Sequence, residues 1–468
     1  MIKVVRFTPV ACLTCLTGLA GLAGAGQGFA QVEQAVVQRI RDQAQPSLVA
    51  VQYTWESEFG RREFVSAGIV VSADGLIMAP MALFDYRIPD DQMKQFKLLV
   101  PTADDVDEID AVFLGRDERA NVAFIRAKDK REWTPVKFVA GELRIGQPLV
   151  SIGLLPKAAN YRTYTQINQI SAMLRGEIPQ ILVSGGLTNV GSPVFDIQGQ
   201  AVGFVHFEAD QPMALNDERT ALAGISRPPI LFTPSSDFLG SVQDPPTGKP
   251  LALPWIGIVH ANGLRKEVAE YFGLKDQPAI EIADVVPGAP ADKAGLKAGM
   301  IIVKANGRGL TRGDEPRELP MILNRQIVRM KVGQVVTLSV LPGKGQAEKE
   351  FAVTLEEMPS RPSQAARYYA EDMGFVVRAS VFMDTYLRRL PADAGGVVVA
   401  AIRPQGPAQT AKLEGGDMIV EVSGQTVKNL EQFREVYVQS RAAKPREAVV
   451  IVVLREGRNQ TLRLEPPQ

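Results

Sequence analysis

Short apolar runs separated by Gly, Asp and Pro turns dominate the first half of the chain. They have the length and composition of β-strands and recur at regular spacing, which is typical of a β-barrel or β-sandwich. Examples are residues 47–55, 63–80, 110–127, 147–155 and 200–209. Helical spacing of apolar residues occurs at 32–45, where Pro46 ends the pattern. We therefore expect one short helix followed by a β-rich domain.

Two segments rich in proline and other turn residues, 245–254 and 358–367, predict linkers. The two segments that follow them repeat each other at a constant offset of 117 residues. The matched turn residues are Gly257 and Gly374, Pro290 and Pro407, Gly299 and Gly416, and Gly307 and Gly424. This pattern indicates a tandem duplication of a domain of roughly 100 residues, a usual size for a small domain.

The N-terminal 30 residues have the composition of a targeting segment. Lys3 and Arg6 precede an apolar stretch rich in Ala, Gly and Leu, and Gly28 and Ala30 supply the small residues of a cleavage site. An uncleaved membrane anchor is the alternative interpretation. Both cysteines of the chain lie in this segment, so the mature chain is expected to contain no disulfide and no cysteine nucleophile.

The 52 basic and 52 acidic residues give a formal net charge of zero. This balance gives no reason to expect nucleic acid as a partner. No pair of histidines has metal-ligand spacing, and we expect neither a metal nor a cofactor.

Each repeated segment combines an apolar-Gly-apolar loop with a downstream helix start in which a Gly precedes Pro by one or two residues. The first reads "PWIGI" (254–258) and then "GAPADKAGLKAGMIIVKANG" (288–307), and the second reads "DMGFVV" (372–377) and then "QGPAQTAKLEGGDMIVEVSG" (405–424). Both resemble PDZ domains of the bacterial HtrA kind. Such domains bind an extended C-terminal peptide by adding it to a sheet edge.

The resemblance implies two peptide-binding loops and the strands after them, 258–261 and 376–379. In the second unit, 429–440 fits the helix beside the groove, with a capping-box pattern at Asn429 and Gln432. In the first unit Pro320 should start or kink that helix, so peptide binding is expected more in the second unit. The expected peptide-binding residues are Trp255, Ile256, Gly257, Ile258, Met373, Gly374, Phe375, Val376, Phe433 and Tyr437.

The β-rich part resembles the protease domain of HtrA/Deg serine proteases. "SAGIVVSADGLIMAPMALF" (66–84), "GRDERANVAFIRA" (115–127) and "TNVGSPVFDIQGQAVGF" (188–204) are similar to the family's histidine, aspartate and serine segments in order and spacing. The three catalytic positions of the family then fall on Ala82, Asn121 and Val190. A serine protease of this type needs a base, an orienting carboxylate and a hydroxyl, and none of these three side chains supplies one.

The resemblance therefore implies a mostly β chain, with a trypsin-like double β-barrel followed by two PDZ-like α+β domains. The expected division is a signal peptide (1–30), a degenerate protease domain (31–244), a first PDZ domain (255–357) and a second PDZ domain (368–468), with the two linkers between them. We expect a non-catalytic, exported protein of the periplasm or cell envelope. It would bind protein C-termini or unfolded segments, as a scaffold, a chaperone-like binder or a regulator of an active HtrA-type protease.

Two other functions stay open. The first is an active serine endopeptidase with a displaced site, in which Ser192 would act as nucleophile and His206 as base. The second is a structural interaction protein in which the β-rich domain forms oligomers. HtrA relatives commonly form trimers through the N-terminal part of the protease domain, and a homotrimer is one assembly that the resemblance implies.

Overall fold

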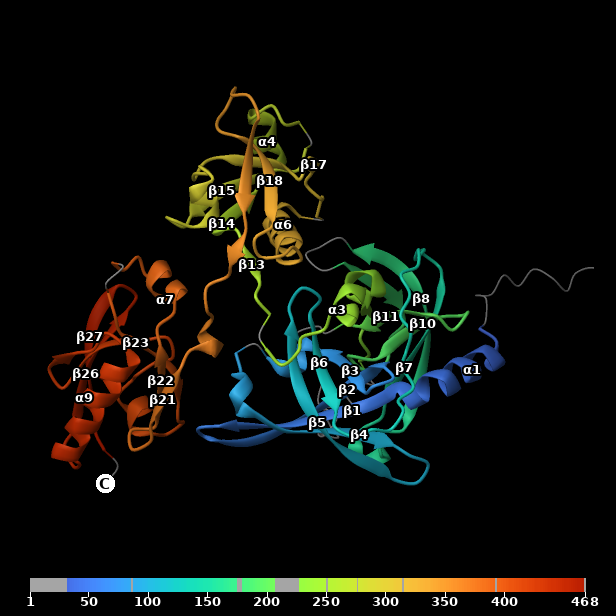
Figure 1. Cartoon of the computed structure of the whole chain (residues 1–468), viewed down its shortest axis with the longest axis horizontal. Coiled ribbons are helices and arrows are strands. Elements are labelled where there is room, and N and C mark those ends of the chain that lie inside the picture. The colour runs from blue at the N-terminus through green and yellow to red at the C-terminus, as the bar shows by residue number, and fades with distance from the viewer. Residues whose placement is uncertain are drawn as a thin grey trace, which may run out of the picture.

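The computed structural model describes residues 32–466, apart from 86, 175–178, 207–226, 250, 276, 314 and 392–393. The expected targeting segment, residues 1–30, lies outside the described residues. Figure 1 shows two β-barrels and two smaller α+β units along the chain. Within the described part, no helix has both the length and the apolar character needed to cross a membrane.

The first barrel follows one short helix, α1 (Gln34–Ala44), which ends just before Pro46 as the sequence predicts. Six strands close in the order β1-β2-β3-β6-β5-β4. Their bounds are β1 Leu48–Ser57, β2 Gly60–Ser72, β3 Leu76–Pro80, β4 Met93–Pro101, β5 Val106–Asp117 and β6 Val122–Ala127.

The second barrel closes in the order β10-β11-β12-β9-β8-β7. Its strands are β7 Pro148–Leu154, β8 Thr163–Leu174, β9 Gln180–Ser184, β10 Pro193–Asp196, β11 Ala201–Val205 and β12 Leu231–Pro234. One buried cluster joins Ile40 of α1 to residues of both barrels, including Phe124, Ile152 and Phe195. The expected double β-barrel is confirmed, and its two halves share a core.

The first α+β unit is connected to the rest of the chain by two short paired strands, which we call the stem. In the stem, β13 (Pro254–Trp255) pairs with β20 (Glu356–Glu357). Its sheet has the order β14-β15-β16-β18-β19, with a short strand β17 (Arg308–Gly309) beside β16. The strands are β14 Ile258–Gly263, β15 Ile280–Val285, β16 Ile301–Ala305, β18 Val335–Leu341 and β19 Lys349–Thr354, and the helices are α4 Lys266–Tyr271, α5 Pro290–Lys293 and α6 Leu319–Val328.

The second α+β unit repeats this arrangement and adds one strand. Its sheet has the order β21-β22-β23-β24-β26-β27, with β25 (Gln425–Thr426) beside β24. The strands are β21 Arg367–Ala370, β22 Phe375–Ala379, β23 Val397–Ile402, β24 Met418–Val422, β26 Val449–Arg455 and β27 Arg458–Leu464, and the helices are α7 Phe382–Leu387, α8 Pro407–Thr410 and α9 Leu430–Ala443.

The 117-residue offset read from the sequence also relates the elements. It carries β15 onto β23, α5 onto α8, and β16 onto β24 without any shift in their first residues. The paired glycines Gly257 and Gly374 both have positive φ, at 85° and 70°. Glycine adopts such angles without the steric cost that a Cβ brings. The duplication is therefore visible in the backbone as well as in the sequence.

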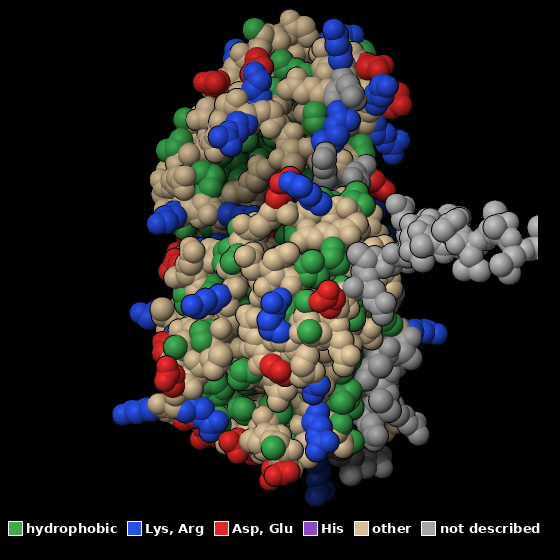
Figure 2. Space-filling view, turned by 90° about the vertical axis from the view of Figure 1, so that its right-hand side faces the viewer, with side chains coloured by type: hydrophobic (Ala, Val, Ile, Leu, Met, Phe, Trp, Pro, Cys, Tyr) green, Lys and Arg blue, Asp and Glu red, His purple; other side chains and the backbone are tan. Residues whose placement is uncertain are grey.

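Two local predictions about helix ends hold. Pro320 lies in the first turn of α6 and starts the helix rather than kinking it. Asn429 caps α9, because its side-chain oxygen accepts from the N–H of Gln432 at 2.9 Å. Basic and acidic side chains are mixed on the face seen in Figure 2, with no large field of one sign.

Candidate functional site

The three positions that the family resemblance marks as catalytic meet between the two barrels. Ala82 lies in the 3-10 turn Met81–Phe84 after β3, and Asn121 in the turn before β6. The N–H of Met81 donates to the carbonyl oxygen of Asn121 at 3.2 Å. Gly191, directly after Val190, lies so close to Pro80 that an added Cβ would come within 2.8 Å of its Cδ. The chain thus brings the three positions together, but the side chains there carry no acid, base or nucleophile.

The loop that resembles a nucleophile loop, residues 188–192, is held in shape by Asn189. Its side-chain oxygen accepts from the N–H of Leu154 at 3.1 Å and from the hydroxyl of Ser192 at 2.8 Å. Val190 is 2% exposed. The loop is a well-bonded turn with an apolar side chain at the position of the expected nucleophile.

The backbone donor expected for an oxyanion hole in this loop is already used. In serine proteases the N–H groups of the nucleophile and of the residue two before it bind the oxyanion, and here the earlier one belongs to Thr188. That N–H donates to the side-chain oxygen of Ser151 at 3.0 Å. An oxyanion would therefore have to displace this hydrogen bond.

Ser192 and His206, the alternative catalytic pair, each have another partner. Ser192 is buried and donates to Asn189, whereas the Nδ1 of His206 lies 3.0 Å from the hydroxyl of Thr233. Burial, followed by the charge of Arg325, lowers the pKa of His206 to about 4. The imidazole is therefore neutral at pH 7, but no contact in the described part of the chain directs it at Ser192.

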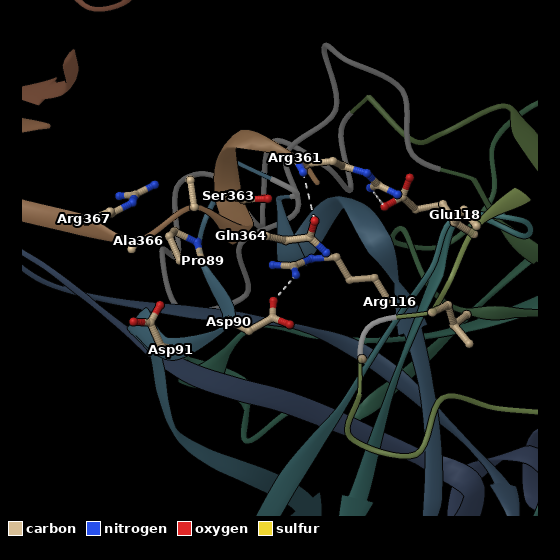
Figure 3. A pocket seen from close by; sticks show the side chains of 14 residues that line it. Pro89, Asp90, Asp91, Arg116, Glu118, Arg361, Ser363, Gln364, Ala366 and Arg367 are labelled. Carbon is tan, nitrogen blue, oxygen red and sulfur yellow. Dashed lines mark hydrogen bonds and ion pairs between the residues drawn. The ribbon is translucent and has the colours of Figure 1, made fainter. Parts of the chain in front are cut away.

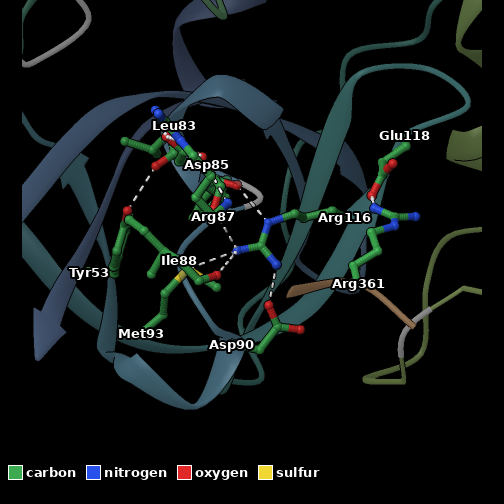
Figure 4. Close-up of polar contacts among 11 residues, drawn as sticks. Tyr53, Leu83, Asp85, Arg87, Ile88, Asp90, Met93, Arg116, Glu118 and Arg361 are labelled. Atoms are coloured by element: carbon green, nitrogen blue, oxygen red, sulfur yellow. Dashed lines mark hydrogen bonds and ion pairs between the residues drawn. The ribbon is translucent and has the colours of Figure 1, made fainter. Parts of the chain in front are cut away.

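Arg116 organises the segment that follows Ala82. Its guanidinium donates to the carbonyl oxygens of Phe84, Asp85 and Ile88 and pairs with the carboxylate of Asp90 (Figure 4). An arginine that saturates several carbonyls of one loop fixes the path of that loop. The sequence analysis did not single out Arg116, since its partners lie 23 or more residues away in the chain.

A charged cavity of about 430 Å³ lies between the first barrel and the segment before β21 (Figure 3). Arg361 pairs with Glu118 across it, and the N–H of Arg361 donates to the side chain of Gln364. Burial and the charge of Arg116 lower the pKa of the Arg361 guanidinium. Arg116 pairs with Asp90 and Arg361 pairs with Glu118, so the charges that line the cavity are largely balanced. The pair of Arg361 and Glu118 also connects the segment before β21 to the first barrel.

The first α+β unit has an open groove of about 530 Å³ between β14 and α6. Residues 358–362 and Met383 of α7 also line it, and its other apolar walls come from the predicted loop, the sheet and α6. They include Trp255, Ile256, Ile258, Ile280, Leu323 and Ile327. Among the described strands, β14 pairs only with β15, which leaves its other edge open. The predicted loop residues Trp255 to Ile258 therefore end at a sheet edge without a strand partner among the described strands, which is the geometry that strand addition needs. Trp255 also contacts Phe382 of the second unit, with ring centroids 6.2 Å apart.

The predicted loop residues of the second unit are buried instead. Met373, Gly374, Phe375 and Val376 form the loop and the start of β22, and the rings of Phe433 and Tyr437 of α9 contact that of Phe375. The side chains of Met373, Phe375, Val376 and Phe433 are 0% exposed. Strand β21 lies along the edge of β22 that would receive a peptide. The sequence favoured peptide binding by the second unit, but in the structure the edge of its groove is occupied by β21, which spans the predicted boundary between the linker and that unit.

The sequence analysis also missed an ionic contact between the first α+β unit and the second barrel. Asp237, 3% exposed at its side chain, pairs with Arg325 and Arg329 of the α6 region, each at 2.5 Å. A basic pair four residues apart on one helix face was the available signal, but its partner is 88 residues away.

Comparison with known proteins gives two family matches. The model of the trypsin-like peptidase domain matches residues 66–204, and that of the PDZ domain matches residues 372–465. The probable periplasmic serine endoprotease DegP-like of Bartonella henselae is 27% identical over 369 residues, covering 77% of this chain and 68% of that protein. Its counterpart of Hahella chejuensis is 26% identical, covering 75% and 71%.

Solved structures share the fold. The HtrA-type protease AlgW with a decapeptide aligns with a TM-score of 0.51 at 17% identity, covering 69% of this chain and 99% of that one. AlgW with a tripeptide gives 0.52 at 18% identity, covering 69% and 98%. Together with the family matches, these findings support an HtrA/DegP-type architecture, in which a trypsin-like domain precedes a PDZ domain.

Proposed function

We propose that this HtrA/DegP-like chain is a non-catalytic binding protein of the periplasm or cell envelope that captures extended protein segments or C-termini. The observation that carries the proposal is the open edge of β14 beside α6, lined by apolar side chains. A sheet edge gives main-chain hydrogen bonds and the pockets beside it select side chains. The relatives named periplasmic support the location.

The absence of catalysis rests on the chemistry of three positions. Alanine at 82 accepts no proton, asparagine at 121 gives no orienting charge, and valine at 190 has no hydroxyl. Removing a triad member leaves only a residual effect of about 10³–10⁴ over water. Such a chain would act by holding unfolded segments, as a scaffold, or by regulating an active HtrA-type protease.

An active serine endopeptidase with a displaced site is the second candidate, and the names of the relatives favour it. A fluorophosphonate probe together with casein digestion separates the two. Our proposal expects neither labelling nor cleavage by the wild-type chain. Specific labelling that disappears in Ser192→Ala would establish the second candidate.

The triple variant Ala82→His, Asn121→Asp and Val190→Ser tests the assignment of these positions. If they form the site, the variant gains probe labelling at residue 190, which peptide mapping detects. The double variant that keeps Val190 is the matched control and should stay unlabelled. Labelling of that control at another serine would show that the site lies elsewhere.

Peptide capture is tested with a library of C-terminal decapeptides against the mature chain. Binding should be lost when the groove of the first unit is altered. Ile258→Asp places a charge at the start of β14, whereas Val335→Asp, at a 47% exposed position of β18, is the control. If no peptide binds the wild-type chain, or if both variants bind equally well, the first unit is not the receptor.

A further inference from the structure

The edge of β22 in the second unit already carries an extended segment. Strand β21 pairs with it in antiparallel register, with Arg367 opposite Arg378 and Ala370 opposite Phe375. The N–H of Ala379 also donates to the carbonyl oxygen of Ala366 at 2.9 Å. Five residues of the chain, 366–370, therefore line the edge where strand addition would place a peptide.

This segment runs in the direction of a bound C-terminal peptide. Its last residue, Ala370, reaches the predicted peptide-binding loop 373–376. The N–H of Gly374 in that loop donates to the carbonyl oxygen of Ala370 at 2.8 Å. In capture of a C-terminus, backbone N–H groups of such a loop receive the terminal carboxylate, and here a main-chain carbonyl takes a comparable place.

Alternate side chains of the segment face the helix, as they do along any strand. The ring of Tyr368 contacts Phe433 and Tyr437 of α9, with centroids 6.0 and 6.1 Å away. Ala370 is 1% exposed. The segment thus fills the apolar space between β22 and α9 with one aromatic and one small side chain.

The intervening side chains point the other way, onto the tip of the β1–β2 hairpin. Tyr369 meets Phe59 edge to face with centroids 5.6 Å apart, and Arg367 lies 3.8 Å from Glu58. Figure 1 shows this hairpin extending from the first barrel toward β21. The groove-filling and outward faces of β21 can therefore be changed separately.

The first unit arranges the matching segment differently. Pro254 and the first loop residue, Trp255, form β13, which pairs with β20 and not with β14. The N–H of Met358 donates to the carbonyl oxygen of Leu253, so the segment is tied to the stem. The two copies of the fold thus differ in whether the preceding segment lies along the groove.

We propose that residues 366–370 are an intramolecular ligand of the second unit and close its groove to other peptides. The groove would accept an extended segment with an aromatic side chain two positions before a small final residue. A ligand tethered by a short loop has an effective concentration on the order of millimolar. A peptide at tens of micromolar would not displace it. The inference rests on the second unit and does not depend on peptide capture by the first.

The test uses the mature chain and the peptide RPSQAARYYA, which copies residues 361–370 and has a free carboxylate. A photoreactive p-benzoylphenylalanine replaces its first tyrosine, and mass spectrometry maps the cross-links. We expect wild-type chain to give no cross-links at 430–443. Tyr368→Ser and Ala370→Asp should release the strand and raise that yield ~10-fold or more, given the tethered concentration.

Tyr369→Ser is the matched control, because it removes a tyrosine of the same strand that does not face α9. It should behave as wild type. Wild-type cross-linking at 430–443 equal to that of Tyr368→Ser would overturn the inference, as would folded release variants that gain none. Cross-links at 319–328 report the first unit separately, so failure of one proposal is distinguishable from failure of the other.

If neither release variant folds, amide hydrogen exchange tests whether residues 366–370 occupy the groove of the second unit. In wild-type chain the N–H groups of Gly374 and Ala379 should exchange slowly, since Ala370 and Ala366 accept their hydrogen bonds. Slow exchange together with no cross-linking at 430–443 supports the internal ligand. Rapid exchange of both amides would show an open groove and contradict it.

Discussion

Whether the site between the two barrels can catalyse a reaction depends on single residues. Asn189 keeps the loop at 188–192 in place through three hydrogen bonds, to Leu154 twice and to Ser192. Val190 contributes only apolar bulk. The geometry of a nucleophile loop and the nucleophile itself are therefore separable, because the turn depends on Asn189 and Gly191 and not on residue 190.

His206 gives a prediction about pH. Its folded pKa of about 4 lies below the unfolded value of about 6.5, so the unfolded chain binds the extra proton between these values. Stability from this group is present above pH 6.5 and is lost as the pH falls toward 4. Between pH 7 and pH 5 the free energy of unfolding should drop by about 2 kcal/mol through His206.

Urea unfolding of wild type and His206→Gln at both pH values measures that drop. The variant keeps a hydrogen-bonding side chain for Thr233 and should lose the His206 part of the dependence. The charges of Arg325 and Asp237, which act on His206 in opposite senses, remain in both chains. Equal pH dependence in the two chains would contradict the prediction.

The two PDZ-like units differ in the arrangement of their secondary-structure elements. The turn glycines, the helix starts and the cap of α9 follow from local residue preferences, and the sequence predicted them. Strand β21 escaped prediction because Arg-Tyr-Tyr-Ala straddles the expected boundary at residue 367 between the linker and the second unit, and because its pairing with β22 leaves no local pattern. Whether a segment lies in a groove depends on competing tertiary contacts, which no local pattern encodes.

A substitution at Gly257 tests whether the loop of the first groove contributes to peptide binding. The φ of Gly257 is 85°, and a Cβ there would come within 2.4 Å of the Cβ of Ala289. Gly257→Ala should therefore distort the loop of the first groove and weaken binding of a library-selected decapeptide about tenfold or more, equivalent to ~1.4 kcal/mol. Fluorescence anisotropy of the labelled peptide measures the affinity.

Gly299→Ala is the control for that variant. It has the same φ of 85°, but its Cβ would point into open space, so it brings backbone strain without the clash. Its affinity for the decapeptide should stay close to that of wild type. Equal losses in the two variants would show that strain anywhere in the unit, rather than the loop, governs binding.

At the scale of the whole molecule, long-range ion pairs join different parts of the chain. Asp237 receives Arg325 and Arg329, and Arg361 pairs with Glu118. Residue spacing predicted a β-rich domain and two repeated units, and the family resemblance implied two barrels. Neither predicted these contacts, because each joins residues more than 80 positions apart. The division of the chain into units follows from local sequence patterns, whereas the placement of the units relative to one another does not.

Asp237→Asn should loosen the first unit from the second barrel. Removing the charge leaves Arg325, 8% exposed at its side chain, in a buried site, and losing a partner there costs about 3 kcal/mol. Proteolysis within 245–254 should become severalfold faster. Glu465→Gln, whose partner Arg463 is 71% exposed, is the control and should cleave as wild type does. Unchanged cleavage of Asp237→Asn would show that other contacts hold the unit.

The stem of the first unit has a consequence for the ancestry of the chain. Pro254 lies opposite Glu357 and Trp255 opposite Glu356, so the backbone leaves the remainder of the molecule and returns to it at nearly the same point. A module attached in this way can be gained, lost or exchanged in one recombination event without separating the ends that it leaves behind. The two units differ at this point in the structure, because β14 has one strand partner among the described strands whereas β22 also carries β21.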